Sequence, residues 1–378
     1  MLLTILIFII TLLILVVIHE LGHFLVAKKF NIKVLEFGFG IPPRAFGKKW
    51  GETLISLNWL PFGGFVRLLG EDEVDKKVLE NERSFAAQTV GKRIAVVVAG
   101  VAMNLLLAWI LFYAVLGFQG FRAEFPLFID HQFIGVNQEN ESIILIQAIS
   151  KDSPADSAGL NIGDRIVAIN DEFLKTNNDL ISKIKELAGS EVKITLSDPE
   201  QENFRTINLV PRENPPEGEG PLGVSLAEVK IANIEYQNTF QKILSGPIHS
   251  VNIITYSGKI LGKLISESIE TKRIEPVSQT VSGPVGITSL VNTILTQSKN
   301  PLLPYIDFIA ILSLNLAVMN ILPIPALDGG RFFFLLFEAI TKRKVHAEIE
   351  KYIHTAGMVI LLALMVLITF SDLQKIFK

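Results

Sequence analysis

The chain has 378 residues, of which 49% are hydrophobic and only 19% charged, and its mean hydropathy of +0.42 is too high for a single soluble globule. Its net charge of −3 is spread along the sequence without a basic stripe, which argues against a nucleic-acid partner. The lack of cysteine excludes a disulfide framework, a thiol nucleophile and a cysteine-bound zinc, so any metal must be held by His, Asp or Glu.

Four uncharged apolar runs indicate membrane helices, at residues 2–18, 94–118, 308–327 and 355–370. The first is predicted to be a retained span rather than a cleaved signal peptide. No basic residue precedes it, and its helical pattern continues into the residues that follow. The fourth is short, so we expect bilayer thinning or snorkelling at its ends. The sequence therefore predicts a polytopic α-helical membrane protein with about four transmembrane helices.

Basic residues indicate how these helices are oriented. Twelve lysines and arginines lie between the first two spans, in 27–93, and five lie between the last two. Loops rich in Lys and Arg tend to remain in the cytoplasm. We therefore expect the N-terminus, the segment 119–304 and the C-terminus to lie on the other side of the membrane.

The segment 119–304 divides into two parts. Residues 143–210 alternate β-rich runs with a turn at Gly163-Asp164 and an amphipathic helix from about Thr176 to Ala188. This α+β order resembles a PDZ domain of the bacterial protease type, a fold that adds a peptide strand to an exposed sheet edge. A Pro/Glu/Gly-rich stretch at 211–221 is predicted to end this domain, and 236–300 reads as amphipathic interfacial helices.

Four regions are therefore expected along the chain. They are an N-terminal transmembrane region at 1–118 with a membrane-associated β-type loop in 27–93, an extracytoplasmic PDZ-like domain at 137–212, a linker and interfacial segment at 213–304, and a C-terminal transmembrane region at 305–378.

His19, Glu20 and His23 form the motif HELGH at the end of the first apolar run. Histidines at positions i and i+4 lie on one face of a helix, so both imidazoles can bind one zinc ion, with Glu20 beside them as general base. Ionisable residues in a membrane span cost roughly 2.5–3.5 kcal/mol each on insertion scales. Three of them within five positions therefore indicate a catalytic metal site rather than a chance match.

Two histidines leave such a site one protein ligand short, because catalytic zinc usually has three and a water. The HxxGxxH continuation of metzincins does not follow His23. Asp328, in NILPIPALDGG after the third run, is the best candidate, because the predicted topology places it on the same side as the histidines. An ordinary turn would also explain Leu-Asp-Gly-Gly, but Pro323 and Pro325 break the helix where a ligand must bend inward.

HELGH in the first span with NILPIPALDGG in a later one resembles the site-2 protease family of intramembrane zinc metalloproteases. The likeness covers nearly the whole chain, because residues 38–72, SFAAQTVGKRIAVVVAG (84–100) and SGPVGI (282–287) are similar to bacterial members with a PDZ domain. The resemblance implies that His19, His23 and Asp328 are zinc ligands, Glu20 is the catalytic base and Asn320 binds the substrate backbone or the oxyanion. Many relatives have proline after Ala-Gly where this chain has Val101, and the best-studied Gram-negative type has two PDZ domains.

These observations predict a zinc metalloendopeptidase that cleaves single-pass membrane proteins within their transmembrane segments. Its active site would lie near the cytoplasmic side of a bacterial cytoplasmic membrane. The resemblance suggests anti-sigma factors or signal-peptide remnants as substrates and an upstream site-1 protease as a partner. The PDZ-like domain is expected in the opposite compartment, where it would bind a peptide or exclude substrates by size.

A transmembrane substrate must unwind before cleavage, and LNWLPFGGFVRLLG (57–70) suits the pairing of an extended chain. Gly63 and Gly64 would leave room for another backbone, and apolar side chains such as Phe65 would dip into membrane lipid. A plain membrane-resting loop is the alternative interpretation.

Two other functions fit the same fold. A catalytically inactive PDZ-type membrane adaptor would not need an intact HExxH motif together with Asp328. A membrane-anchored zinc protease that acts on soluble proteins is disfavoured only by the position of the motif in an apolar run.

Overall fold

The computed structural model describes residues 2–71, 78, 80–174, 176–197, 204–273, 278, 280–298 and 300–377. Small parts of the predicted regions 27–93, 137–212 and 213–304 lie outside these described residues. The chain forms two compact units. One comprises the residues up to Phe118 together with those from Ile243 onward, and the other comprises Gln119–Lys242.

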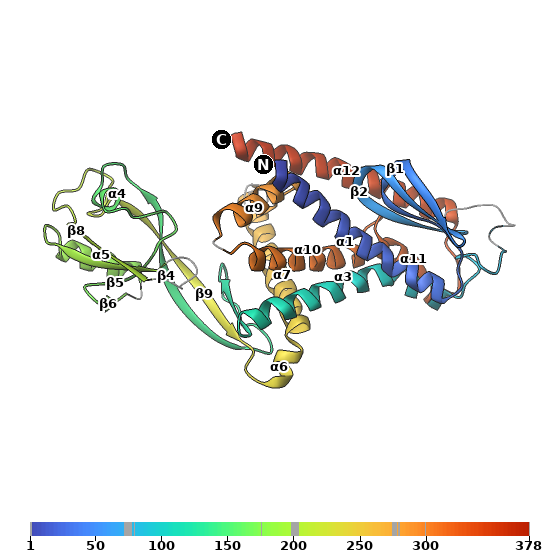
Figure 1. Cartoon of the computed structure of the whole chain (residues 1–378), viewed down its shortest axis with the longest axis horizontal. Coiled ribbons are helices and arrows are strands. Elements are labelled where there is room, and N and C mark those ends of the chain that lie inside the picture. Colours follow the sequence, from blue (N-terminus) through green and yellow to red (C-terminus); the bar gives the residue numbers. More distant parts are fainter. Residues whose placement is uncertain are drawn as a thin grey trace. The chain divides into compact units, whose positions relative to one another are not determined.

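The first unit is mainly helical. Its helices are α1 (Leu2–Lys29), α3 (Val90–Phe118), α7 (Ser245–Thr271), α9 (Pro284–Gln297), α10 (Leu302–Ile321), α11 (Asp328–Thr341) and α12 (Ala347–Phe377), and its strands are β1 (Val34–Trp50) and β2 (Thr53–Leu68) (Figure 1). Helix α3 packs against both α1 and α10. Among the described helices, four are long and apolar enough to cross a membrane: Leu2–Lys29, Val90–Phe118, Leu302–Ile321 and Glu348–Lys375. The predicted number of such helices is confirmed.

Two of these helices have bounds that differ from the prediction. The third was expected at 308–327, but α10 ends at Ile321. Leu322 precedes Pro323 and has an extended backbone, with φ −64° and ψ 146°, because a following proline disfavours the helical conformation. The fourth is not short, since α12 has 31 residues and continues past the apolar run on both sides. The helix is therefore longer than the apolar run, and its polar ends extend beyond that run.

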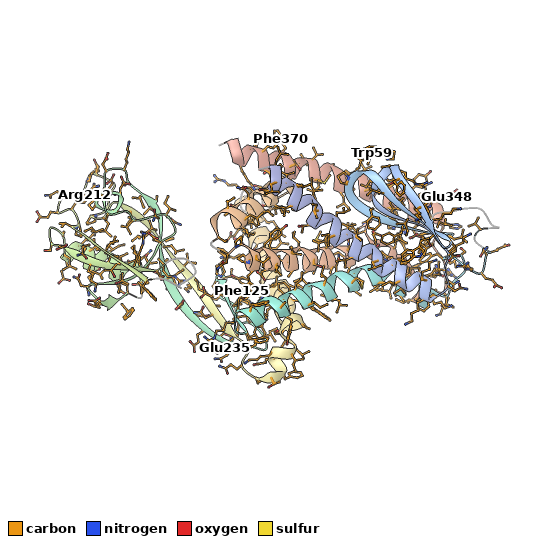
Figure 2. All side chains as sticks on the ribbon, viewed as in Figure 1. Trp59, Phe125, Arg212, Glu235, Glu348 and Phe370 are labelled. Carbon is orange, nitrogen blue, oxygen red and sulfur yellow. The ribbon has the colours of Figure 1, made fainter. Side chains whose placement is uncertain are left out.

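Strands β1 and β2 form an antiparallel sheet that packs against α1 (Figure 1). Residues 34–39 pair with 64–68 on one side and with 54–57 on the other, while 44–50 pairs with 53–58. The segment 64–68 is thus an edge of the sheet within the described part of the chain. Large apolar side chains on this sheet are exposed, including Phe46, Trp50 and Trp59. Trp59 is labelled on the sheet in Figure 2.

Two groups of charges fix the sheet. The buried carboxylate of Glu36 accepts hydrogen bonds from Arg44 at 3.0 and 3.1 Å and lies 3.2 Å from Arg67. At the turn between the strands, Glu52 accepts hydrogen bonds from Lys28 of α1 at 2.7 Å and from Arg83 at 2.6 and 2.7 Å. The turn is therefore attached to the last residues of α1.

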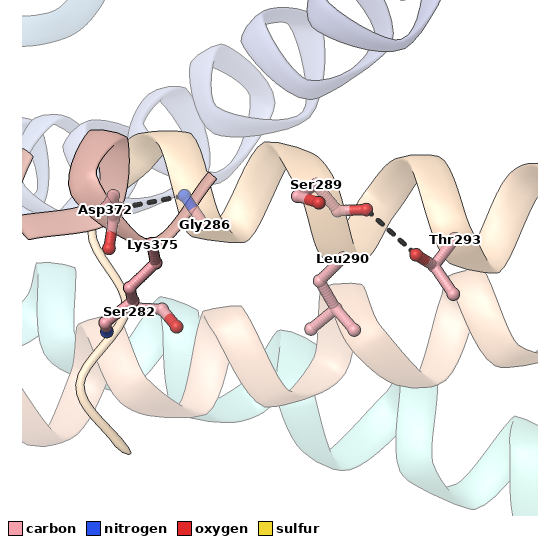
Figure 3. Close-up of a pocket in the computed structure, with 7 residues that line it drawn as sticks. All are labelled: Ser282, Gly286, Ser289, Leu290, Thr293, Asp372 and Lys375. Carbon is pink, nitrogen blue, oxygen red and sulfur yellow. Dashed lines mark hydrogen bonds between the residues drawn. The ribbon is translucent and has the colours of Figure 1, made fainter. Parts of the chain in front are cut away.

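Helices α7 and α9 are not among the four long apolar helices, as the sequence predicts for 236–300. The first half of α7 packs against α3, where Gly246 adjoins the backbone carbonyl of Trp109. Helix α9 is joined to α12, because Asp372 accepts hydrogen bonds from the amides of Gly283 and Gly286, both at 2.8 Å. Figure 3 shows the bond from Gly286. Lys375 donates to the Val281 carbonyl at 3.0 Å.

The second unit is an antiparallel sheet covered by a helix. Its strands are β3 (Arg122–Pro126), β4 (Asn137–Ile149), β5 (Arg165–Ile169), β6 (Glu172–Phe173), β7 (Val192–Ser197), β8 (Phe204–Leu209) and β9 (Val224–Glu235). They follow the order β3-β9-β4-β5-β7-β8, with β6 on β5. Its helices are α4 (Pro154–Ser157) and α5 (Asn177–Glu186), and α6 (Thr239–Ile243) follows at the boundary with the first unit.

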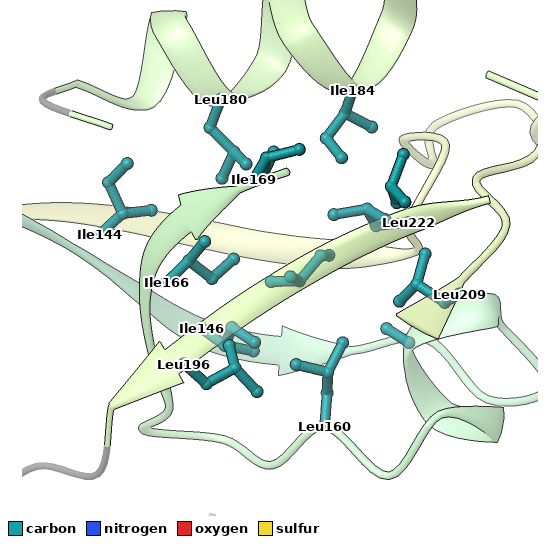
Figure 4. Packing of buried hydrophobic residues seen from close by; sticks show 13 residues of the cluster. Ile144, Ile146, Leu160, Ile166, Ile169, Leu180, Ile184, Leu196, Leu209 and Leu222 are labelled. Carbon is teal, nitrogen blue, oxygen red and sulfur yellow. The ribbon is translucent and has the colours of Figure 1, made fainter. Parts of the chain in front are cut away.

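Apolar side chains from α5 and the sheet form the core of this unit. Leu180 and Ile184 of α5 belong to one buried cluster with Ile169 and Ile194 of the sheet. Figure 4 shows Leu180 and Ile184 above Ile169 and Ile166. Helix α5 begins where predicted, because Thr176 and Asp179 form a capping box, and Gly189 follows its end with φ +80°.

The sequence placed the end of this domain at 212 and a linker from 213, but the sheet continues beyond that point. Strand β9 lies beyond the Pro/Glu/Gly-rich stretch and pairs with β4 along its whole length. Its alternation of apolar and polar residues was missed because that stretch resembles an interdomain linker. The unit therefore extends from Gln119 to Lys242.

Candidate metal centre

His19, His23 and Asp328 form a compact cluster in the first unit. The Nε2 atoms of the two histidines are 3.1 Å apart, and Asp328 Oδ2 lies 2.9 Å from His19 Nε2 and 3.2 Å from His23 Nε2. His19 is buried, and the other two are half-buried. The helical i, i+4 spacing brings the imidazoles together, and a separate element supplies the carboxylate.

Asp328 is the first residue of α11, directly after the loop 322–327. Glycines follow it because the loop packs against them. A Cβ on Gly330 would lie 2.7 Å from the Ile324 carbonyl oxygen, and one on Gly329 would overlap the carbonyls of Ile321 and Leu322. The Asp-Gly-Gly sequence thus lets the chain turn sharply enough to return a carboxylate to α1.

Two ion pairs hold α11 in place. Arg331 pairs with Glu71, just after the β1–β2 sheet, and Arg93 of α3 donates to Glu338 at 2.5 Å. Both side chains of the second pair are largely buried, at 9% and 12% exposure. Because Arg331 lies one turn from Asp328, its pair restricts the start of the helix that carries the carboxylate, while the Arg93–Glu338 pair holds the last turn.

A backbone carbonyl and a side-chain amide contact the Nδ1 atoms of the two histidines, on the side of each ring away from the cluster. A carbonyl oxygen can only accept, so His23 Nδ1 carries the proton and donates to Val96 O at 2.8 Å, which leaves Nε2 with its lone pair facing the cluster. His19 Nδ1 lies 3.4 Å from Nδ2 of the fully buried Asn104, whose Oδ1 has no hydrogen-bond partner among the described residues. With its oxygen turned toward His19, this amide would accept the Nδ1 proton and leave His19 Nε2 free in the same way.

Gly100 of α3 faces both imidazoles. A Cβ at this position would lie 2.7 Å from His19 Cε1 and Nε2 and closer still to His23 Nε2. On α1, Gly22 adjoins the backbone carbonyl of Ala99 in the same way. Glycines on both helices therefore allow α1 and α3 to cross at close range at the cluster.

Of the other predicted site residues, Glu20 is half-buried on α1 and lies beside the sheet edge, since a Cβ on Gly64 would be 3.4 Å from Glu20 Cγ. Gly63 has φ +79°, and the ring of Phe65 lies over Gly38 on the neighbouring strand. Asn320 is in the last turn of α10, and among the described residues no hydrogen bond joins it to the cluster.

Three residues around the cluster were not predicted as site residues: Val96, Gly100 and Asn104. Asn104 had a recognisable signal, because an amide in the apolar run 94–118 is expensive to bury in a membrane without a partner. The role of the Val96 carbonyl had no signal in the sequence, since every residue has one.

The donor set fits zinc. Two imidazole nitrogens and one carboxylate oxygen are ligands that Zn²⁺ prefers, and three protein ligands leave the fourth position open, as catalytic sites do. The tautomer that Val96 imposes on His23 is also the one that a metal ligand needs.

Comparison with known proteins identifies the family. The model of peptidase family M50 matches residues 7–364. The chain belongs to peptidase family M50. This family assignment confirms the resemblance to site-2 proteases that HELGH and NILPIPALDGG suggested.

Individual relatives agree with this assignment. A candidate zinc metalloprotease of Clostridium perfringens is 32% identical over 359 residues, which cover 95% of each chain. The zinc metalloprotease RasP of Geobacillus kaustophilus is 26% identical over 447 residues, or 96% of each chain. The regulator of sigma-W protease RasP of Bacillus subtilis is 26% identical over 444 residues, also 96% of each. This M50 peptidase is thus a zinc metalloprotease with membrane helices, and Zn²⁺ is its cofactor.

Proposed function

We propose that this M50 peptidase cleaves single-pass membrane proteins within their transmembrane segments, at a zinc ion held by His19, His23 and Asp328. The observation that carries the proposal is the position of the HExxH histidines inside an apolar helix of 28 residues, with the Asp328 carboxylate 2.9 and 3.2 Å from their Nε2 atoms. A metal centre in such a helix is within reach of peptide bonds in a bilayer.

Each residue then has a defined part in hydrolysis. Zinc, when bound, acidifies a water molecule and polarises a peptide carbonyl. The Glu20 carboxylate accepts a proton from the attacking water and later delivers it to the leaving amine. Val96 and Asn104 keep the histidines in the ligand tautomer. Asn320 holds the substrate backbone or the developing oxyanion.

The edge segment 64–68 is the proposed platform for the substrate. It pairs on one side with 34–39, and Gly64 adjoins Glu20. An extended substrate added to the free side would pass close to the general base, and Gly63, Gly64 and Phe65 would contact its backbone. Cleavage would therefore require the substrate helix to unwind locally.

The distribution of Lys and Arg supports a cytoplasmic position for 27–93, and hence a catalytic centre near the cytoplasmic side of a bacterial membrane. On this topology the unit Gln119–Lys242 is extracytoplasmic. Its helix-covered antiparallel sheet supports a PDZ-like role as a peptide-binding or size-selecting module. The exposed Trp50 and Trp59 of the β1–β2 sheet suit contact with membrane lipid.

The name of the Bacillus subtilis relative, a regulator of sigma-W, supports membrane-bound regulators such as anti-sigma factors as substrates. An upstream site-1 protease would then trim the outer part of the substrate before this enzyme acts.

The first experiment compares wild type with Glu20→Ala in liposomes. Each protein is given two substrates: a single-span transmembrane helix with a helix-breaking centre, and a soluble peptide with the same cleavable sequence. Cleavage of the membrane substrate by wild type alone, abolished by a zinc chelator, is expected. Preferential cleavage of the soluble peptide would favour a membrane-anchored protease for soluble proteins. Zinc-free wild type without any product would favour the inactive adaptor.

Two further experiments test the proposed substrate platform, segment 64–68, and the unit Gln119–Lys242. N–H groups of neighbouring residues in a strand point alternately into and out of the ladder, so proline at Phe65 and proline at Val66 remove different donors. Cleavage that survives every proline from Phe65 to Leu68 in a folded protein would exclude strand addition.

Because Arg122 pairs with Glu235, excision of 122–235 leaves two adjacent ends for a short linker. This excision should widen the substrate range.

A further inference from the structure

Helix α12 contacts the loop that precedes Asp328. His354 Nδ1 accepts a hydrogen bond from the backbone N–H of Ala326 at 2.9 Å, across 28 residues of sequence. A backbone amide can only donate, so this nitrogen must be unprotonated and the ring neutral in this arrangement. The imidazole is thus an acceptor aimed at a single loop amide, two residues before the carboxylate.

The amide that His354 holds belongs to an unusual residue. Ala326 has φ +78°, in the left-handed region that non-glycine residues rarely adopt. Its neighbour Pro325 has no N–H, so the loop 322–327 has few donors with which to fix its own shape. Leu327 donates to the Ile324 carbonyl at 3.2 Å, and Ile324 donates to that of Leu322 at 2.6 Å. The bond from Ala326 to His354 is a hydrogen bond that ties this turn to helix α12.

Glycines allow the two elements to meet closely. Gly357, one turn beyond His354, packs on Pro325, and a Cβ there would lie 2.7 Å from the Pro325 carbonyl oxygen. On α11, a Cβ on Gly330 would lie 3.2 Å from His354 Cε1. Helix α12 therefore seats against both the loop and the first turn of α11, with His354 between them.

We propose that His354 is a positioning residue for the metal centre: by holding the Ala326 amide, it fixes the strained turn that delivers the Asp328 carboxylate to His19 and His23. This inference rests on the proposed role of Asp328 as a zinc ligand. His354 touches neither the metal nor the substrate in this scheme and acts through the backbone. Its removal should loosen zinc binding while leaving all three ligands in place.

The test measures zinc affinity by chelator competition and the visible spectrum of the cobalt(II)-substituted protein in detergent. His354→Leu should lower zinc affinity about 10- to 100-fold and alter the cobalt spectrum. His354→Asn should restore most of the affinity, because its Oδ1 occupies nearly the place of Nδ1 and accepts the same bond. Thr355→Ala is the matched control, since the described structure gives this exposed hydroxyl one hydrogen bond, to the Lys351 carbonyl of its own helix.

Gly357→Ala is an independent variant that pushes α12 away from Pro325 without touching His354, and it should lower zinc affinity as well. If His354→Leu does not fold, His354→Gln takes its place. The longer glutamine side chain carries its amide past the position of Nδ1, so it should not accept the hydrogen bond from Ala326. Wild-type zinc affinity and cobalt spectrum in a folded His354→Leu or His354→Gln protein would overturn the proposal.

Asp328→Ala separates this inference from the proposed function. If Asp328→Ala loses zinc and His354→Leu does not, only the positioning role fails. If Asp328→Ala binds zinc as wild type does, the ligand assignment fails and the role of His354 falls with it.

Discussion

Gly100 of α3 lies so close to His23 of α1 that no side chain fits between them. The same glycine lies against His19, where a Cβ would be 2.7 Å from Cε1. Glycine in a helix interior is less favourable than alanine by about 1 kcal/mol, so helix formation does not explain a glycine at this position. Its place here is explained by the close crossing that the two histidines need.

Gly100→Ala should therefore displace the imidazoles and lower zinc affinity by about tenfold or more. Gly91→Ala is the control in the same helix, because a Cβ added there would meet no neighbouring atom within 4 Å and alanine favours the helix. Zinc content after dialysis against a weak chelator separates the two. Equal zinc retention in both variants would contradict the assigned role.

Asn104→Leu should weaken zinc binding, because His19 loses the amide that fixes its tautomer. The expected loss is about 10- to 100-fold in metal affinity. Asn104→Asp keeps an oxygen that can accept the Nδ1 proton and should retain more zinc than the leucine variant. Ser313→Ala serves as the control, since Ser313 bonds to the backbone carbonyl of Asn104 and not to its amide. Identical affinities in the leucine and aspartate variants would argue against tautomer control.

Asp372→Ala should destabilise the protein without affecting the metal. It leaves the amides of Gly283 and Gly286 without their acceptor at the start of α9, and a buried group left unsatisfied costs about 1–3 kcal/mol. Asp372→Asn keeps one acceptor oxygen and should lose less. Lys375→Met should lose least, because its bond to Val281 is exposed. Thermal unfolding in detergent, with zinc content measured in parallel, gives this ranking or refutes it.

The turn between β1 and β2 should detach from α1 at low pH. Hydrogen bonds from Arg83 and then Lys28 hold the pKa of the Glu52 carboxyl at about 2, below its ordinary value of 4.5. A lowered folded-state pKa stabilises the protein fully above about pH 4.5, and this contribution is lost as the pH falls toward 2. Glu52→Gln should melt about 1–2 °C below wild type at neutral pH, since the side chain is exposed.

The two melting temperatures should converge as the pH is lowered from 4.5 toward 2. Protection of the 50–53 amides from hydrogen exchange, taken relative to the intrinsic exchange rate at each pH, should fall over the same range in wild type only. A gap between the two proteins that stays constant down to pH 2 would show that Glu52 is not the titrating group.

Local patterns gave much of this fold in advance. Apolar runs located four helices, the HExxH spacing located two members of the cluster, and Thr176 with Gly189 bounded α5. Helix ends were harder, because α12 extends through Glu348 and Asp372, whose charges end an apolar run but not a helix. Strand pairing was also hidden from local patterns, because strand β9 is recognised by its ladder with β4, which lies far earlier in the chain, from Asn137 to Ile149.

The metal cluster contains residues that local sequence patterns predict and residues that they do not. Asp328 could be named because its turn residues are distinctive, whereas Gly100 and the Val96 carbonyl take part only through where α3 crosses α1. A glycine and a backbone carbonyl look alike at every position of an apolar helix. Their roles depend on tertiary packing, which no local spacing encodes.

The glycine contacts between α1 and α3 also constrain motion. Gly22 and Gly100 bring the two backbones so near each other that any sliding or rotation would collide with Ala99 or with the imidazoles. These two helices must therefore move as one rigid body. Helix α12 differs, since most of its side chains are exposed and its described hydrogen bonds to other elements lie near His354 and Asp372. Any separation of helices in this unit would therefore cost least at α12, where the fewest packed contacts are lost, while the α1–α3 pair stays intact.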